Sequence, residues 1–110
     1  MKEYAFSLNL KDDPKAIEAY KEYHANVWPE VTRSLKAVGI MDMKIFLLGR
    51  RMFMYMVTED DFVPDVDFPR YLTLDPKCQE WENLMGTFQE KLPEAQPHEK
   101  WARMEKVFQL

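Results

Sequence analysis

The sequence predicts an α+β fold of the ferredoxin-like type, an antiparallel four-stranded sheet with helices on one face and the element order β-α-β-β-α-β. Two observations predict it. Apolar residues alternate or run together over short segments bounded by turn residues, as in strands. Between these segments the apolar spacing changes to three and four, as in helices. A chain of 110 residues has room for one core, so we expect a single domain over residues 1–110.

The first third of the chain is expected to form a strand and two helices. Tyr4–Leu10 alternates between apolar and small or polar positions, as a half-buried strand does. Asp13 suits an N-cap and Pro14 the first helical position, so a helix is expected over Pro14–Ala25. A proline at position 29 interrupts the helical spacing because it lacks a backbone donor, and a second helix is expected over Pro29–Val38.

Two further strands are expected to form an antiparallel hairpin, because only a short connection separates Ile40–Leu48 from Met52–Glu59. Within the second strand, Met52–Val57 is apolar on both faces, which predicts a central position in the sheet. A sheet with helices on one face leaves its other face bare. We therefore expect that apolar bare face to be buried against a second copy of the chain, as a homodimer.

The second half of the chain is less regular. Asp60–Pro69 is acidic and contains prolines, so it is expected to be a loop, followed by one or two helical turns in Phe68–Leu74. A second Asp-Pro pair predicts a helix over Pro76–Phe88. Gln89–Lys100 is expected to be a long irregular connection, a type of segment that is often functional or crosses to a partner. Met104–Leu110 is expected to be the final strand.

Composition argues against several function classes. The formal charge is −4, from 15 Lys and Arg against 19 Asp and Glu, and the basic residues are scattered, which argues against nucleic acid as a partner. No apolar run reaches the ~20 residues of a membrane span, and no secretory signal pattern is present, so a cytoplasmic protein without a membrane partner is expected. No glycine-rich phosphate loop, zinc-spaced cluster or nucleophile-elbow serine occurs, so we expect no metal and no cofactor.

Three ring side chains follow one another at four-residue spacing, Tyr20, His24 and Trp28, and are expected to point the same way. A histidine of near-neutral pKa can donate or accept a proton in a pocket lined by such rings. The alternative is that His24 only satisfies a backbone group in the core. An aromatic residue and a carboxylate also follow each other at Trp81-Glu82 and could line the same pocket. The alternative is that Trp81 is simply a buried ring and Glu82 a solvated carboxylate.

The stretch Tyr20-Lys21-Glu22-Tyr23-His24-Ala25-Asn26-Val27-Trp28-Pro29-Glu30 resembles the Y-x-x-x-H-x-x-x-W-P-E signature of the L-rhamnose mutarotase family. Cys78-Gln79-Glu80-Trp81 resembles the family's helix before its binding tryptophan, and Met104-Glu105-Lys106-Val107-Phe108 resembles its ending. The resemblance implies a dimeric α/β barrel of paired ferredoxin-like subunits that interconverts the α and β anomers of a 6-deoxy-hexose without a cofactor. It also implies that His24 is the proton donor and that Tyr20 and Trp81 are sugar ligands.

Two positions depart from the family pattern. The rhamnose enzymes carry Tyr where this chain has Met43 and a second Trp where it has Glu82. Losing a phenol removes one hydrogen bond to a sugar hydroxyl, whereas a carboxylate offers a strong bidentate acceptor. Both residues, together with Trp28, are therefore candidate substrate contacts. The reaction type is expected to hold, with L-rhamnose or a related 6-deoxy-L-hexose such as L-fucose as the sugar.

Mutarotation opens a hemiacetal and recloses it on the other face, so one acid and one base suffice. His24 is expected to supply the acid, and Glu82 is a candidate base if it faces the pocket. Two other function classes remain open. One is a monooxygenase or heme-handling enzyme of the same dimeric barrel fold, which also uses an inward histidine, and the other is a non-catalytic sugar-binding module.

Overall fold

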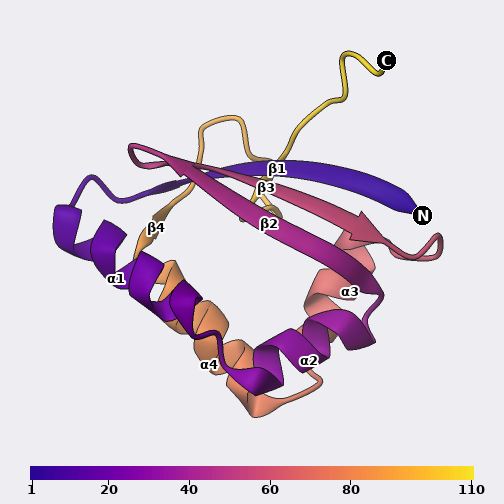
Figure 1. The fold of residues 1–110 in the computed structure, drawn as a ribbon, viewed down its shortest axis with the longest axis horizontal. Helices are drawn as coiled ribbons and strands as arrows, with labels where there is room; N and C mark the ends of the chain where they lie inside the picture. The colour runs from indigo at the N-terminus through magenta and orange to yellow at the C-terminus, as the bar shows by residue number, and fades with distance from the viewer.

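The computed structural model describes residues 1–110 and shows an antiparallel sheet with four helices on one side of it (Figure 1). Neighbouring strands follow the order β2-β3-β1-β4, and β5 also pairs with β1, which confirms the ferredoxin-like fold with each helical crossover divided in two. The elements are β1 (Lys2–Leu10), α1 (Pro14–Ala25), α2 (Pro29–Ala37), β2 (Ile40–Leu48), β3 (Arg51–Thr58), α3 (Pro64–Tyr71), α4 (Pro76–Gly86), β4 (Gln89–Glu90) and β5 (Ala102–Arg103).

The helix starts lie where local chemistry predicts them. The Asp13 carboxylate accepts a hydrogen bond from the Lys15 backbone N–H at 3.0 Å, and Asp75 accepts one from Lys77 at 2.8 Å. Each cap is followed by a proline at the first helical position, where its missing N–H costs nothing. At the end of α2 the chain turns into β2 through Gly39, whose φ of 102° favours glycine.

The two faces of the sheet differ in burial. Tyr4, Phe6 and Leu8 of β1 lie opposite Met56, Met54 and Met52 of β3, and all six side chains are buried beneath the helices. On the opposite face, Phe46 and Phe53 form a cross-strand pair with ring centroids 6.1 Å apart, and both are exposed. The central position predicted for the second strand of the hairpin is confirmed, because β3 lies between β1 and β2.

The predicted loop over Asp60–Pro69 is wrong in its second half, because α3 begins at Pro64. Asp67 stabilises the first turn by accepting hydrogen bonds from the Val63 N–H at 2.8 Å and from Arg70 Nε at 2.9 Å. Those bonds hold the pKa of Asp67 below its usual range. Pro69 removes only one backbone donor from so short a helix, so a proline inside it is tolerated.

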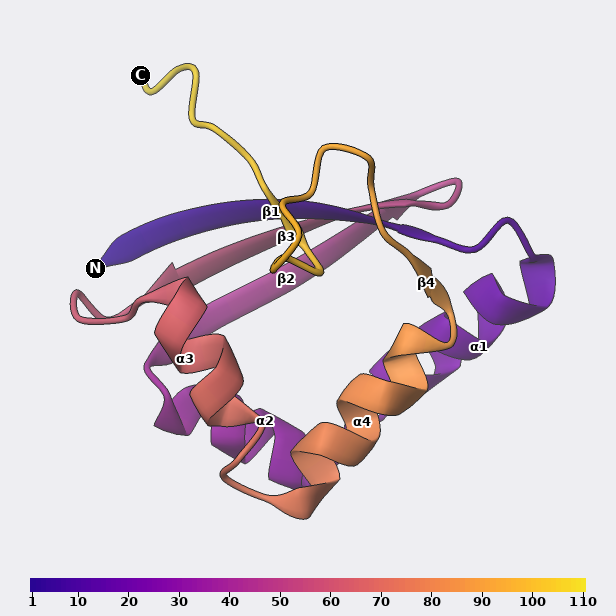
Figure 2. The same cartoon turned by 180° about the vertical axis from the view of Figure 1, so that it is seen from behind.

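The predicted final strand over Met104–Leu110 is also wrong. The last strand pairing is limited to Ala102–Arg103, and the chain beyond it leaves the sheet on the side away from the helices (Figures 1 and 2). Two contacts hold the start of this tail, a hydrogen bond from the Met104 N–H to the Ala5 carbonyl at 2.8 Å and an ion pair of Lys106 with Glu3 at 3.3 Å. A strand needs a neighbour for its backbone groups, and the tail has none within the chain.

Candidate active site

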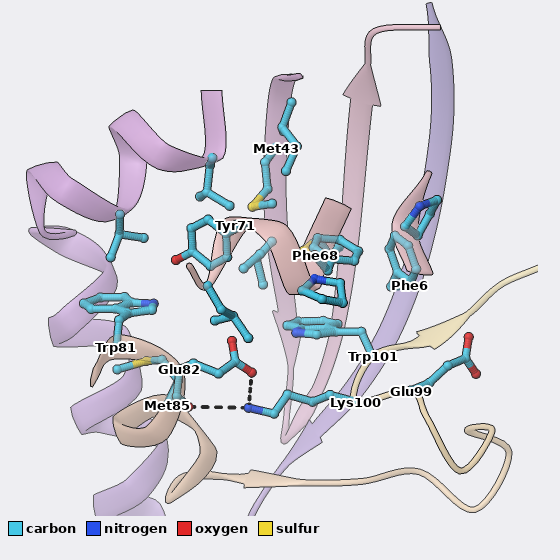
Figure 3. A pocket seen from close by; sticks show the side chains of 18 of the residues that line it. Phe6, Met43, Phe68, Tyr71, Trp81, Glu82, Met85, Glu99, Lys100 and Trp101 are labelled. Atoms are coloured by element: carbon cyan, nitrogen blue, oxygen red, sulfur yellow. Dashed lines mark hydrogen bonds and ion pairs between the residues drawn. The ribbon is translucent and has the colours of Figure 1, made fainter. Parts of the chain in front are cut away.

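A cavity of about 1000 Å³ lies between the inner face of the sheet and the helices. Its volume is at the upper end of the roughly 300–1,000 Å³ that ligand pockets occupy. Most of its apolar lining comes from the sheet, α2 and α3, whereas α1, α4, β4 and the connection after β4 contribute most of its polar side chains. Figure 3 shows Trp81, Glu82 and Met85 approaching from α4, with Lys100 and Trp101 on the other side. The cavity is therefore divided into an apolar and a polar part.

His24 lines this cavity from the last turn of α1, and its side chain is half-buried. Its Nδ1 lies 2.8 Å from the Tyr20 carbonyl oxygen, and because a carbonyl only accepts, Nδ1 carries the hydrogen. Nε2 has no partner in the chain and presents a lone pair when the ring is neutral. Burial lowers the pKa of His24 despite the bond to Tyr20, so the neutral ring is favoured at neutral pH. The alternative that His24 only satisfies a backbone group explains the contact of Nδ1 with Tyr20. It gives no role to Nε2.

Tyr20 and Trp81 enclose the imidazole of His24. The Tyr20 ring stacks on it at 4.2 Å between centroids, and the Trp81 ring meets it edge-on at 5.3 Å. Both aromatic side chains are buried and both line the cavity. Burial raises the pKa of Tyr20 to about 12, so its hydroxyl is neutral at ordinary pH and accepts a hydrogen bond from Gln89 Nε2 at 3.4 Å. The structure thus brings Tyr20, His24 and Trp81 together at one cavity.

Trp28 lies behind Trp81 and does not line the cavity. The two indoles meet edge-on with centroids 5.0 Å apart, and the Lys77 ammonium lies 5.2 Å from the Trp28 ring centroid. The expectation that Trp28 points the same way as His24 assumed one continuous helical spacing. That spacing ends at Asn26, and Trp28 has an extended backbone with φ −58° and ψ 133°, so its side chain is directed elsewhere.

Glu82 lines the cavity. From the sequence, Glu82 is a candidate base on the condition that it faces the pocket, and that condition is met. Its Oε1 lies 2.5 Å from Lys100 Nζ, and the same ammonium lies 3.5 Å from the Glu82 backbone carbonyl (Figure 3). The negative charge of Glu82 contributes to the raised pKa of both Tyr20 and Tyr71, which places the carboxylate near both phenols. Sequence reasoning missed Lys100, because it lies in an irregular segment without a motif.

The apolar part of the cavity includes Met43, which is half-buried on β2 and packs against the core. Other side chains that share this part are those of Phe6, Ile45, Met54, Phe68 and Trp101. His98 lies at the rim, with 62% of its side chain exposed and its Nε2 3.5 Å from Asp65. No group of three or more His, Cys, Asp or Glu side chains is placed to hold a metal ion. No helix is long and apolar enough to cross a bilayer.

Residues 3–110 match the sequence model of L-rhamnose mutarotase. The chain belongs to the L-rhamnose mutarotase family. An L-fucose mutarotase of Xanthomonas campestris is 38% identical over 100% of this chain and 89% of its own, and a UPF0734 protein of Dictyostelium discoideum is 49% identical over 99% and 90%. The family consists of isomerases of the 1-epimerase type, so this mutarotase homologue interconverts sugar anomers, as predicted.

Solved structures of two other proteins have the same fold as this chain. An L-rhamnose mutarotase from Formosa agariphila superposes with a TM-score of 0.70 at 23% identity, covering 100% of this chain and 99% of the other. A tetracenomycin F2 cyclase from Streptomyces glaucescens shares the fold with a TM-score of 0.65 at 18% identity, covering 100% and 97%. The same fold thus serves another reaction, so it is the family match that favours the mutarotase prediction over the monooxygenase and binding-module alternatives.

Proposed function

We propose that residues 1–110 act as one mutarotase domain whose substrate is a 6-deoxy-L-hexose, L-rhamnose or L-fucose. Relatives with both names support the proposal: the L-fucose mutarotase of Xanthomonas campestris, and an L-rhamnose mutarotase of Enterococcus faecalis that is 31% identical over 96% of this chain. The observation that carries it is a half-buried His24 with a free Nε2, enclosed by Tyr20 and Trp81 in a cavity.

The two parts of the cavity fit the two sides of such a sugar. The rings of Tyr20 and Trp81 offer apolar surface for the C–H side of a pyranose, and Trp28 supports the Trp81 ring from behind. Glu82 accepts hydrogen bonds from sugar hydroxyls through Oε2, which has no partner in the chain. Met43 belongs to the apolar part of the cavity. The methyl group of a 6-deoxy sugar fits such surroundings because, unlike a hydroxyl, it needs no hydrogen-bond partner there.

His24 carries the proton in this mechanism. In ring opening, its neutral Nε2 takes the proton of the anomeric hydroxyl, the electrons of that O–H bond form the C1=O1 double bond, and the C1–O5 pair moves to O5. The imidazolium then gives its Nε2 proton to O5, which leaves a neutral aldehyde and a neutral His24. Rotation about C1–C2 and the reverse steps form the other anomer, so the sugar and enzyme end with the same atoms and charges.

The surroundings of His24 suit both halves of this transfer. The Nδ1–H bond to Tyr20 fixes the tautomer, so Nε2 is always the atom that gains and loses the proton. A lowered pKa keeps the resting ring neutral and makes the imidazolium a stronger acid toward O5. Because O1 and O5 share one carbon, a single histidine reaches both oxygens in turn. The proton-donor role implied by the family resemblance is then the second half of the transfer.

Saturation-transfer NMR of the anomeric protons tests the activity. Purified protein is added to L-rhamnose, L-fucose and D-glucose, and exchange between the anomers is compared with the rate in the same buffer alone. We expect faster exchange for at least one of the two 6-deoxy sugars. Acceleration of D-glucose with neither 6-deoxy sugar affected would contradict the substrate class, whereas no acceleration of any aldose would contradict mutarotation itself.

We also propose that the bare face of the sheet forms a homodimer interface. Phe46, Leu48 and Phe53 are exposed on that face by 56%, 84% and 37%, and the tail that leaves on the same side exposes Val107 and Phe108. Apolar side chains of this size on one face support a contact with a second copy. Light scattering should give twice the 13.2 kDa chain mass, and Phe53→Lys should shift it toward the monomer. A monomer at micromolar concentration would contradict the interface.

The proposed location is the cytoplasm. The lone cysteine, Cys78, is a buried free thiol, the state that a reducing compartment maintains. A protein that exchanges the anomers of a free sugar also needs access to metabolic sugar pools. Cell fractionation with an antibody to the chain should place it with cytoplasmic markers, and recovery with secreted proteins would contradict this location.

A further inference from the structure

Ring opening is faster when a group stabilises the negative charge that develops on the ring oxygen, O5. While Nε2 of His24 is engaged with the anomeric proton, the C1–O5 bond lengthens and negative charge grows on O5. A fixed hydrogen-bond donor or cation beside O5 lowers the barrier at that moment, because such groups act most strongly where charge develops. None of the residues implied by the family resemblance carries a positive charge in this role.

The cavity offers few cations for it. Lys36 is exposed on α2, and His98 is 62% exposed at the rim beside Asp65. The Arg103 guanidinium lies 4.9 Å from the ring centroid of Tyr4, on the sheet side. Lys100 remains, with its ammonium in the polar part of the cavity.

Lys100 is linked to the His24 region through neighbouring groups. Its ammonium is paired with Glu82, whose charge acts on the Tyr20 hydroxyl, and Tyr20 stacks on His24. Glu82 also follows Trp81 directly in α4, and the Trp81 ring meets the His24 ring at 5.3 Å. The ion pair and the histidine therefore line the same polar part of one cavity.

The contacts of Lys100 leave a donor free. The ammonium has three N–H groups, of which one donates to Glu82 Oε1 at 2.5 Å and one to the Glu82 backbone carbonyl at 3.5 Å. The third has no partner in the chain. The ammonium lies close to the backbone of α4 at Gly86, where a Cβ would be in ordinary van der Waals contact with Lys100 Nζ at 3.5 Å. The Lys100 side chain thus reaches toward α4, where its ammonium contacts Glu82 (Figure 3). One N–H remains available to a ligand.

We propose that Lys100 donates this third N–H to the ring oxygen of the sugar during ring opening, and that Glu82 is the positioning residue that holds the ammonium there. The inference rests on the proposed anomer exchange at His24. Lys100 keeps its proton throughout, so the proton balance of the His24 mechanism is unchanged. Glu82 then acts mainly through Lys100, with its free Oε2 left to accept from a sugar hydroxyl.

The test is a kcat and KM measurement on Lys100→Met, Lys100→Arg, Glu82→Gln and the Lys100→Met/Glu82→Gln double variant. Removing a donor aimed at developing charge costs about 10²–10³ in kcat, so Lys100→Met should fall by that factor with a smaller change in KM. Lys100→Arg keeps a cationic donor and should retain part of the rate. The double variant should have the kcat of Lys100→Met, because Glu82 has nothing left to position, and loss of the Oε2 contact to a sugar hydroxyl should appear in KM.

The matched control is Lys21→Met, which removes an ammonium from an exposed ion pair with Glu18 on α1, outside the cavity. It should exchange sugar at the wild-type rate. Thermal unfolding confirms that each variant is folded, and Lys100→Gln replaces Lys100→Met if the latter does not fold. A folded Lys100→Met protein with wild-type kcat, or with only KM raised, overturns the inference while leaving mutarotation intact. A wild-type protein that accelerates no anomer exchange overturns both.

Discussion

The two sides of the cavity differ in what their side chains contribute. The helix wall consists of Tyr20, His24, Trp81 and Glu82 from α1 and α4, and it carries a hydroxyl, an imidazole, an indole N–H and a carboxylate. The sheet wall is formed mainly by Phe6, Met43, Ile45 and Met54 from β1, β2 and β3, which carry no hydrogen-bonding side-chain group, although Asp42 and Arg103 also line the cavity from strands. The imidazole that moves the proton therefore belongs to the helix wall.

The walls also differ in how they are held. In the sheet wall, Met54 pairs in register with Phe6 on one side and Ile45 on the other, so the residues that shape the cavity also form the core. In the helix wall, Tyr20 and Trp81 also belong to the core, but the ionisable groups are held by polar contacts, His24 by a hydrogen bond to Tyr20 and Glu82 by its ion pair with Lys100. We therefore expect substitutions of His24 and Glu82 to change activity and substitutions in the sheet wall to change stability.

The largest expected effect is on the helix wall. Asn at position 24 can place an amide N–H near the position of Nδ1 and keep a donor for the Tyr20 carbonyl, but it has no Nε2 to move a proton. His24→Asn should lower kcat by about 10²–10⁴-fold. Anomer exchange is measured by NMR beside a thermal unfolding curve. A folded His24→Asn protein with the wild-type exchange rate would show that the helix wall does not carry the chemistry.

On the sheet wall, Met54→Ala should reduce the free energy of unfolding instead. The Met54 side chain is 3% exposed, and truncating such a methionine costs about 2–5 kcal/mol through lost burial and a remaining cavity. Urea denaturation measures the loss, and kcat at a temperature where the variant is folded should stay within a few-fold of wild type. Loss of exchange without loss of stability would remove the distinction between the walls.

The pH dependence of kcat sharpens the role of the helix wall. The mechanism needs neutral His24, whose pKa burial has lowered from the ordinary value near 6.5. Exchange above the buffer rate should therefore be constant at pH 7–8 and fall with a midpoint below 6.5, approaching tenfold per pH unit on the acid side. His24→Asn should abolish this step. Activity that rises as pH falls through the same range would show that protonated His24 is the resting catalyst.

The smallest expected effect is a change in sugar preference through the sheet wall. Met43→Tyr introduces the phenol that the family resemblance implies for this position and adds one hydrogen-bond donor, worth about 0.5–1.5 kcal/mol, or up to roughly tenfold in kcat/KM. The ratio of kcat/KM for L-rhamnose over L-fucose should rise by that order. An unchanged ratio would show that Met43 does not contact the part of the sugar that differs.

Most elements could be predicted because their signals are local. The Asp-Pro pairs at Asp13 and Asp75 mark helix starts through bonds within three residues, and the alternation of Tyr4–Leu10 marks a strand. Where prediction was wrong, the deciding contacts were elsewhere. The first turn of α3 is held by Asp67 in a stretch that looks like an acidic loop, and Met104–Leu110 lacks the neighbouring strand that its apolar residues suggested.

The same division holds for the site. Tyr20 and His24 are four residues apart on one helix, so the sequence alone determined that their rings would meet. It did not determine the direction of Trp28, because the helix break at Asn26 turns the chain before that residue. Nor did it bring Lys100 to Glu82, since the two lie 18 positions apart, across the end of α4, the short strand β4 and irregular chain. Only the docking of the β4–β5 connection against α4 decides that contact, because a long side chain in an irregular segment has no spacing rule to indicate its partner.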